Sequence, residues 1–223
     1  MNFKSYPDRD MMMIGLADRI ATQLREAIRN DGHATLSVPG GTTPGPIFDT
    51  LSDIDLEWDK VAVLLNDERW VDEDSPRSNT RLIRERLLTG RAAAATLVPL
   101  YADAPRPEDK MDELAAGIAP HLPISVLLLG MGADMHTASL FPGADRLEEA
   151  LSDDAPIVLA MRAEAAGEPR ITLSAPVLRD AMHIHILITG AEKRAAIEAA
   201  QSLPETQAPV RAVLKNATVH WAE

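Results

Sequence analysis

Short apolar runs alternate along the chain with longer segments whose apolar residues recur at helical spacing. Strand-length apolar runs lie at 34–38, 61–65, 126–129, 156–161 and 182–190. Amphipathic helical patterns lie between or after them, at 10–30, 79–88, 107–119 and 190–201. Runs that are apolar throughout fit strands buried on both faces, as parallel strands are. The alternation therefore predicts an α/β fold, with a mostly parallel sheet flanked by helices.

Shorter elements fit between these segments. Short helices are predicted near 47–51, 145–152 and 176–180, and a last strand at 217–221. The run Thr96–Leu100 is expected at an edge of the sheet, because Pro99 has no N–H to donate to a neighbouring strand. Asn79 is expected to cap the helix that follows it. No repeat or change of composition marks a linker, so residues 1–223 are expected to form one domain.

Composition narrows the setting and the partners. The chain has no cysteine, which excludes thiol catalysis, thiolate metal sites and disulfides, and favours the reducing cytoplasm. The apolar patch Met11–Ile14 is too short for a signal sequence or a membrane span. With 22 Lys and Arg against 34 Asp and Glu, the net charge of −12 disfavours a nucleic-acid partner. A small anion remains possible, since a few cations at close range outweigh a screened global charge.

The segment after the strand at 34–38 has the composition of a phosphate cradle. Gly40 and Gly41 let the backbone approach a phosphate closely, and Thr42 and Thr43 add hydroxyl donors before a helix. The pattern is neither G-x-G-x-x-G nor G-x-x-x-x-G-K-[ST], so it does not indicate a nucleotide site. A plain strand-to-helix turn explains the same residues.

Charged residues gather at two further strand ends. Asp67, Glu68 and Arg69 follow the strand at 61–65, where they form either part of a site or an Asp–Arg pair that fastens the loop. Lys193 falls in the first turn of the helix that follows the strand at 182–190. A cation there is destabilised by the positive end of the helix dipole, and a bound anion would remove this unfavourable interaction. An exposed lysine facing solvent is the plainer interpretation.

The most distinctive stretch follows the strand at 126–129. It reads Gly130-Met131-Gly132-Ala133-Asp134-Met135-His136-Thr137-Ala138-Ser139-Leu140-Phe141-Pro142-Gly143. Ligands of open α/β sheets bind at the carboxyl ends of the strands, which is where this stretch would lie. His136 is therefore the candidate reactive residue, whereas His183 and His185 fall within an apolar strand and are expected to be packed.

Taken in order, these motifs resemble those of the 6-phosphogluconolactonases, over nearly the whole chain. The resemblance rests on Pro39–Pro44, Asp67–Val71 with Ser78 and Asn79, Gly130–Gly143, Arg170–Thr172 and Gly190–Lys193. It implies a Rossmann-like α/β fold with a smaller edge subregion, and a cytoplasmic enzyme of the oxidative pentose phosphate pathway. It also implies hydrolysis of a sugar lactone phosphate by a monomer or homodimer. No metal or other cofactor is expected, because the carboxylates and histidines do not fall into a ligand spacing such as H-E-x-x-H.

The resemblance and the residue types together suggest roles. His136 is the candidate general base, because an imidazole can accept a proton from water at neutral pH and return it to the leaving ring oxygen. Asp134 is expected to orient it. The expected substrate contacts are the cradle, the charged strand end and two later cations: Gly40, Gly41, Thr42, Thr43, Asp67, Glu68, Arg69, Arg170 and Lys193. Asp67 and Glu68 either contact sugar hydroxyls or hold Arg69.

Two other functions fit parts of the pattern. Glucosamine-6-phosphate deaminases share the fold and the early motifs but continue differently after the histidine, and a sugar-phosphate sensor would be expected to lack His136. The chain also departs from the family, which usually has glycine where Met135 stands. Either this methionine is strained because the position requires a positive φ, or it places a side chain near the site where relatives have none.

Overall fold

Four of the five apolar runs form parallel strands of one large sheet in the computed structural model, which describes all residues from Met1 to Glu223. The fifth run, at 156–161, instead contributes a strand to a small antiparallel sheet, because it pairs with the strand that starts at Arg170. The strand order of the large sheet is β1-β10-β9-β6-β2-β3-β5, and each neighbouring pair is parallel. The strands are β1 (Asn2–Ser5), β2 (Ala34–Val38), β3 (Val61–Leu65), β5 (Thr96–Val98), β6 (Val126–Gly130), β9 (His183–Thr189) and β10 (Ala217–Ala222). The predicted fold class is confirmed, and β5 lies at an edge as Pro99 indicated.

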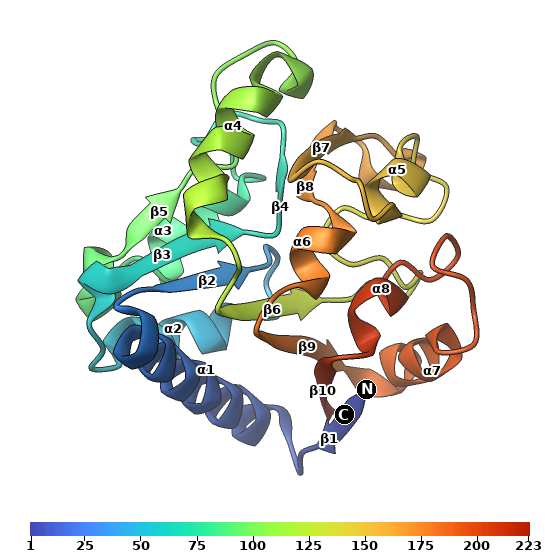
Figure 1. The fold of residues 1–223 in the computed structure, drawn as a ribbon. Helices are drawn as coiled ribbons and strands as arrows, with labels where there is room; N and C mark the ends of the chain where they lie inside the picture. The colour runs from blue at the N-terminus through green and yellow to red at the C-terminus, as the bar shows by residue number, and fades with distance from the viewer.

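Helices connect the strands and cover the sheet (Figure 1). Figure 1 labels α1 (Arg9–Asp31), α2 (Gly45–Asp53), α3 (Asn79–Arg86), α4 (Met111–Ile118), α5 (Leu147–Leu151), α6 (Ala175–Arg179), α7 (Gly190–Ala200) and α8 (Arg211–Leu214). None of them is long and apolar enough to cross a membrane.

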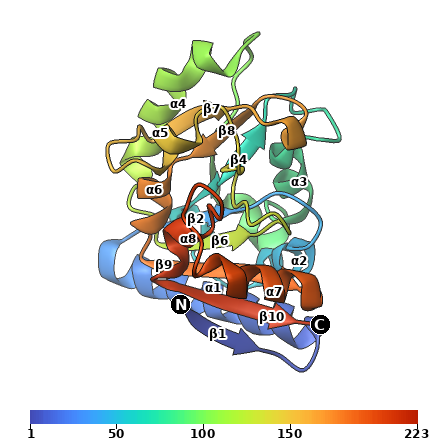
Figure 2. The same cartoon turned by 90° about the vertical axis from the view of Figure 1, so that its right-hand side faces the viewer.

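The longest helix, α1, shows how the sequence sets these elements. The Asp8 side chain accepts a hydrogen bond from the backbone N–H of Met11, and Gly32 ends the helix with a φ of 81°. Its apolar stripe, which includes Leu16, Ile20 and Leu24, is fully buried. Figure 2 shows α1 running along the large sheet, where it packs against β2, β6 and β10.

A second, smaller sheet stands apart from the large one (Figures 1 and 2). It is antiparallel and consists of β4 (Asp67–Arg69), β8 (Arg170–Leu173) and β7 (Val158–Met161). Strand β4 follows β3 after one residue, Asn66, so the chain passes directly from the large sheet into the small one. This sheet is the expected smaller subregion, and it pairs Arg69 with Arg170.

Two local predictions differ from the structure. Ser78, not Asn79, is the N-cap of α3: its hydroxyl accepts a hydrogen bond from the N–H of Arg81, and Asn79 is the first helical residue. The first strand, β1, was not expected, because its exposed residues show no apolar run. It joins the sheet by pairing with β10, so the two ends of the chain lie side by side (Figure 1).

Candidate active site

The candidate site lies where four neighbouring parallel strands end. The carboxyl ends of β9, β6, β2 and β3 meet at one edge of the large sheet, and the small sheet stands over them. An open cavity of about 370 Å³ lies there, a size that suits a small ligand. Its lining includes Gly40, Gly41, Thr43, Asp67, Arg69, Asn79, Gly132, His136, Phe141, Arg170 and Lys193.

His136 lies on a tight turn that follows β6. The backbone N–H of Gly132 donates to the carbonyl of His136 at 3.0 Å, and the N–H of Met135 donates to the carbonyl of Gly132 at 3.0 Å. The hydroxyl of Thr137 donates to the carbonyl of Gly130 at 2.8 Å and ties the turn to the strand. These bonds hold the imidazole at the cavity wall.

Asp134 contacts the imidazole directly. Its Oδ1 lies 2.5 Å from Nδ1 of His136 and also accepts the backbone N–H of His136 at 3.2 Å. A carboxylate oxygen only accepts, so Nδ1 carries a proton and the neutral imidazole has its lone pair on Nε2. Gly132 is required for this contact, because a Cβ there would overlap both side chains. The arrangement can accept a proton at Nε2.

Met135 has a φ of 68°, in the left-handed region that glycine adopts without cost. Its side chain packs against the hydrophobic core and does not line the cavity. Its carbonyl accepts the N–H of Val210 at 3.1 Å, which ties the turn to the segment before α8. The backbone is therefore strained here, and the methionine side chain does not shape the pocket.

Phe141 connects the histidine to the cationic side of the cavity. Its ring centroid lies 4.4 Å from that of His136, and the Arg170 guanidinium lies 5.7 Å from the ring centroid. Phe141 is part of the glycine–histidine motif, but no role was predicted for it. Its position five residues after the candidate base His136 was the sequence feature that could have indicated one.

Arg170 is buried in the cavity wall with few partners. Its Nη1 lies 3.5 Å from Oδ2 of Asp67, its Nη2 donates to the carbonyl of Ala166 at 3.3 Å, and its buried Nε has no hydrogen-bond partner. Burial lowers the pKa of the guanidinium, and the charge of Asp67 opposes that shift. A buried cation with unused donors favours an anionic ligand.

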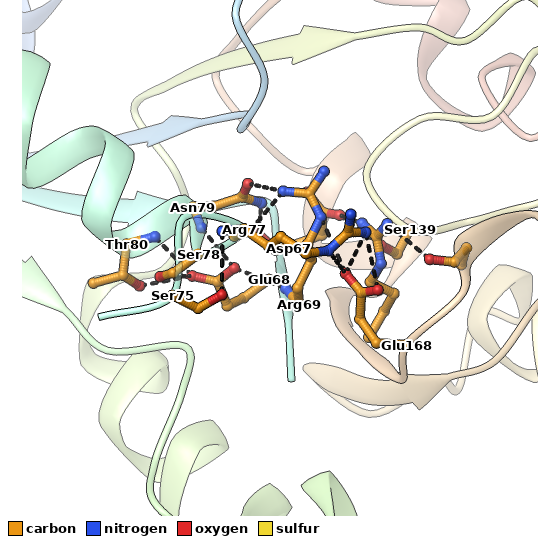
Figure 3. A network of polar contacts seen from close by, with 12 residues as sticks. Asp67, Glu68, Arg69, Ser75, Arg77, Ser78, Asn79, Thr80, Ser139 and Glu168 are labelled. Atoms are coloured by element: carbon orange, nitrogen blue, oxygen red, sulfur yellow. Dashed lines mark hydrogen bonds and ion pairs between the residues drawn. The ribbon is translucent and has the colours of Figure 1, made fainter. Parts of the chain in front are cut away.

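Asp67 helps to fix the same wall. Its Oδ2 also accepts the hydroxyl of Ser139 at 2.5 Å (Figure 3), so it links β4 to the glycine–histidine segment as well as to Arg170. No protein group hydrogen-bonds its Oδ1, and Asp67 lines the cavity. The expectation that the Asp67 carboxylate holds Arg69 is wrong, because it pairs with Arg170 instead. Contact of Asp67 with a sugar hydroxyl stays a prediction.

Lys193 reaches the cavity from the first turn of α7. This helix begins at Gly190, whose φ is 80° and whose carbonyl accepts the indole N–H of Trp221 at 2.9 Å. The next residue, Arg194, lies over the rings of Trp221 and Phe3 at the outer side of the helix. Lys193 is the cavity-lining cation of α7.

The glycine pair after β2 lines the cavity as the sequence suggested. Gly41 has a φ of 84°, which turns the backbone in a way that a side chain would resist. Gly40, Gly41 and Thr43 line the cavity, whereas Thr42 is exposed and does not. Contact of Thr42 with a substrate stays a prediction.

Glu68 lies behind the cavity and does not line it. The side chain is fully buried, and backbone N–H groups and hydroxyls around the start of α3 occupy its carboxylate (Figure 3). Burial raises its pKa, while these hydrogen bonds oppose the shift. The expected substrate contact by Glu68 is corrected, because a carboxylate enclosed in this way cannot reach a ligand.

Arg69 remains at the cavity, held by groups from two directions. Its Nη1 donates to the carbonyl of Arg77 at 2.8 Å and to Oδ1 of Asn79 at 2.9 Å, and its Nε lies 3.4 Å from Glu168 (Figure 3). Asn79 also lines the cavity, which sequence reasoning missed because the residue was interpreted as a helix cap. No group of three or more His, Asp or Glu side chains is arranged to hold a metal ion.

Fold and site together define an α/β protein with a small-ligand pocket at its strand ends, lined by a histidine and several cations. A family model described as glucosamine-6-phosphate isomerases/6-phosphogluconolactonase matches residues 7–221. The chain belongs to this family.

Curated relatives point to one branch of it. The chain is 44% identical to a 6-phosphogluconolactonase of Mesorhizobium japonicum, with 99% of this chain and 95% of the relative covered. It is 40% identical to a 6-phosphogluconolactonase of Pseudomonas aeruginosa, with 93% and 89% covered. A crystal structure of a 6-phosphogluconolactonase from Shewanella baltica superposes with a TM-score of 0.96 at 36% identity, covering 100% of this chain and 98% of the other.

Proposed function

We propose that the chain hydrolyses 6-phospho-D-glucono-1,5-lactone to 6-phospho-D-gluconate in the oxidative pentose phosphate pathway, with His136 as the general base. The observation that carries the proposal is that the imidazole of the Asp134–His136 pair lines the same cavity as Arg170 and Lys193. A base and cations in one cavity match a substrate with an ester carbonyl and a phosphate. A cytoplasmic setting, suited to a chain without cysteine, is part of the proposal.

The reaction begins with a water molecule at the free Nε2 of His136. As the water oxygen bonds to C1 of the lactone, its proton passes to Nε2 and the carbonyl electrons move onto the carbonyl oxygen. The imidazolium that forms is stabilised by the Asp134 carboxylate at Nδ1. When the carbonyl re-forms, the bond from C1 to the ring oxygen breaks, and the imidazolium returns its proton to that oxygen.

The phosphate is assigned to the cationic side. Arg170 offers unused guanidinium donors, Lys193 a point charge, and Gly41 a backbone turned by its positive φ. Arg69 adds a guanidinium near the same wall. Asp67 has an unoccupied oxygen at the cavity and is assigned to a sugar hydroxyl.

The substrate assay separates this function from that of the other branch. We expect the purified protein to accelerate lactone hydrolysis and to release no ammonia from glucosamine 6-phosphate. Ammonia release without lactone hydrolysis would overturn the proposal. Tight binding of 6-phosphogluconate without turnover of either substrate would indicate a sensor.

The phosphate assignment has its own test. Lys193→Ala should raise KM for the phosphorylated lactone about tenfold or more and leave turnover of unphosphorylated glucono-1,5-lactone nearly unchanged, because only the former meets the lost charge. Lys60→Ala, an exposed lysine paired with Glu57, is the matched control. An equal loss on both lactones would remove Lys193 from phosphate binding.

A further inference from the structure

The side chain of Asn79 hydrogen-bonds to strand β4 (Figure 3). It also lies against Gly40 of the glycine cradle. We infer that Asn79 is a positioning residue that aims the Arg69 guanidinium at the anionic ligand, and that the buried Glu68 carboxylate fixes Asn79 for this task. The inference deepens the proposed function, since it rests on Arg69 as a ligand contact.

Glu68 is fully buried and has no cationic partner. Its Oε1 accepts the backbone N–H groups of Arg69 at 2.7 Å and Asn79 at 2.8 Å. Its Oε2 accepts the N–H of Thr80 at 2.7 Å, the Thr80 hydroxyl at 2.8 Å and the Ser78 hydroxyl at 3.3 Å. A carboxylate bonded in this way at the start of a helix locks the first turn of α3 onto β4.

With its backbone fixed by Glu68, Asn79 directs its amide back toward β4. Nδ2 donates to the carbonyl of Asp67 at 3.0 Å, and Oδ1 accepts from Nη1 of Arg69 at 2.9 Å. The amide therefore spans the two residues on either side of Glu68. Using both ends of the amide leaves it one orientation, which fixes the acceptor that Arg69 meets.

The other contacts of the Arg69 guanidinium leave its Nη2 without a protein partner. Nη1 is shared between Asn79 and the carbonyl of Arg77, and Nε lies near Glu168 without a hydrogen bond. No protein acceptor binds Nη2, and Arg69 lines the cavity. A guanidinium held through Nη1 keeps Nη2 available for a ligand oxygen without ordering the side chain during binding.

The close approach of Gly40 to Asn79 is independent evidence that the position of the Asn79 side chain matters for the site. A Cβ on Gly40 would overlap the Asn79 amide, so the cradle backbone approaches that amide as closely as the chain allows. Asn79 thus sets the distance between the cradle and Arg69, two walls of one cavity.

A double-mutant cycle on ligand affinity tests the inference. The Kd of 6-phosphogluconate is measured by calorimetry for the wild type, Asn79→Ala, Arg69→Ala and the double variant. We expect Asn79→Ala to raise Kd about tenfold in the wild type and less than twofold when Arg69 is already absent, because Asn79 acts through Arg69. Asn79→Ser, which is too short to reach Arg69, should behave as Asn79→Ala does.

The expected result also includes turnover: kcat on the lactone stays within about twofold of the wild type, because the base is untouched. Thr35→Val is the control for lost stability and should leave Kd unchanged. It removes the hydrogen bond that the hydroxyl of Thr35, on β2, donates to the backbone carbonyl of His121. Equal effects of Asn79→Ala with and without Arg69, or no effect in either, would overturn the inference. A wild type that binds 6-phosphogluconate but does not hydrolyse the lactone would instead overturn the proposed function, and the cycle would still decide the role of Asn79.

Discussion

The carboxylate of Asp134 and the imidazole of His136 are in direct contact, with Oδ1 and Nδ1 2.5 Å apart. Only one residue, Met135, separates the two in the chain. The side chains are 45% and 31% exposed, so the pair contributes little to folding stability. Its effect is on orientation, because it selects the tautomer that leaves Nε2 free.

Asp134→Asn tests this orientation. An amide can present N–H instead of an acceptor to Nδ1, which favours the wrong tautomer and removes the charge that stabilises the imidazolium. We expect kcat on the phosphorylated lactone to fall by about 10- to 10³-fold with KM little changed. The thermal midpoint should stay near that of the wild type. An unaltered kcat would show that Asp134 does not assist the base.

Met135 provides a prediction about stability. Its φ of 68° disfavours any residue with a Cβ, by about 1 kcal/mol. Met135→Ala and Met135→Gly both remove the same side-chain packing, so their difference isolates the Cβ. We expect the glycine variant to have the larger free energy of unfolding, by about 1 kcal/mol, in urea titrations.

Glu26 is the matched position for this comparison, because it is exposed within α1 and has ordinary helical neighbours. At this helical position the order should reverse. The free energy of unfolding of Glu26→Ala should be larger than that of Glu26→Gly by about 1 kcal/mol. If alanine were the more stable residue at both positions, the backbone at Met135 would not be strained.

A second buried network lies away from the site, around two histidines. His185 donates from Nε2 to Gln23 at 2.7 Å, its Nδ1 accepts from Nε2 of His220 at 3.0 Å, and Nδ1 of His220 accepts the hydroxyl of Tyr6 at 2.8 Å. With both rings neutral, every ring nitrogen has a hydrogen-bond partner. Burial lowers the pKa of His185 to about 4 and that of His220 to about 3, with positive neighbours such as Arg19 adding to both shifts.

These shifts predict acid sensitivity of the fold. Because the pKa of each histidine is lower in the folded state than its unfolded value of about 6.5, the unfolded chain binds more protons at mildly acidic pH. The stability is therefore fully present above about pH 6.5 and declines as the pH falls toward 4. Between pH 7 and 5 each ring should cost about 2 kcal/mol of unfolding free energy.

Urea titrations at the two pH values check this prediction. His220→Gln should lose about 2 kcal/mol less than the wild type on going from pH 7 to pH 5, since one titrating ring is gone. His33→Gln, at an exposed position, should lose as much as the wild type. Identical losses in His220→Gln and the wild type would contradict the role of the network.

Much of the fold follows from sequence pattern, because buried parallel strands are apolar throughout and their carboxyl ends lie at one edge. That rule placed Gly40, His136 and Lys193 near one another, and they do line one cavity. Each position is set by a strand end and a short following turn, which local sequence determines.

Other parts of the fold and of the site depend on contacts between residues far apart in the sequence. The local pattern of apolar and polar residues does not predict such contacts. The three-residue strand β4 is a strand only because β8 pairs with it, and β1 only because β10 does. Glu68 and Arg69 are adjacent charged residues, and the sequence suggested both as substrate contacts. The pleat of β4 sends Glu68 into the interior and Arg69 to the cavity. Asn79 was predicted to be a helix cap from its residue type alone, because its partners Asp67 and Arg69 lie on β4 and are not evident from local sequence.

The central claim is that His136 activates water while other residues hold the phosphate. The most direct measurement compares His136→Ala with the wild type for both kcat on 6-phospho-D-glucono-1,5-lactone and Kd for 6-phosphogluconate. The account predicts that kcat falls by about 10²- to 10⁴-fold while Kd changes little. Unchanged kcat in His136→Ala would contradict it.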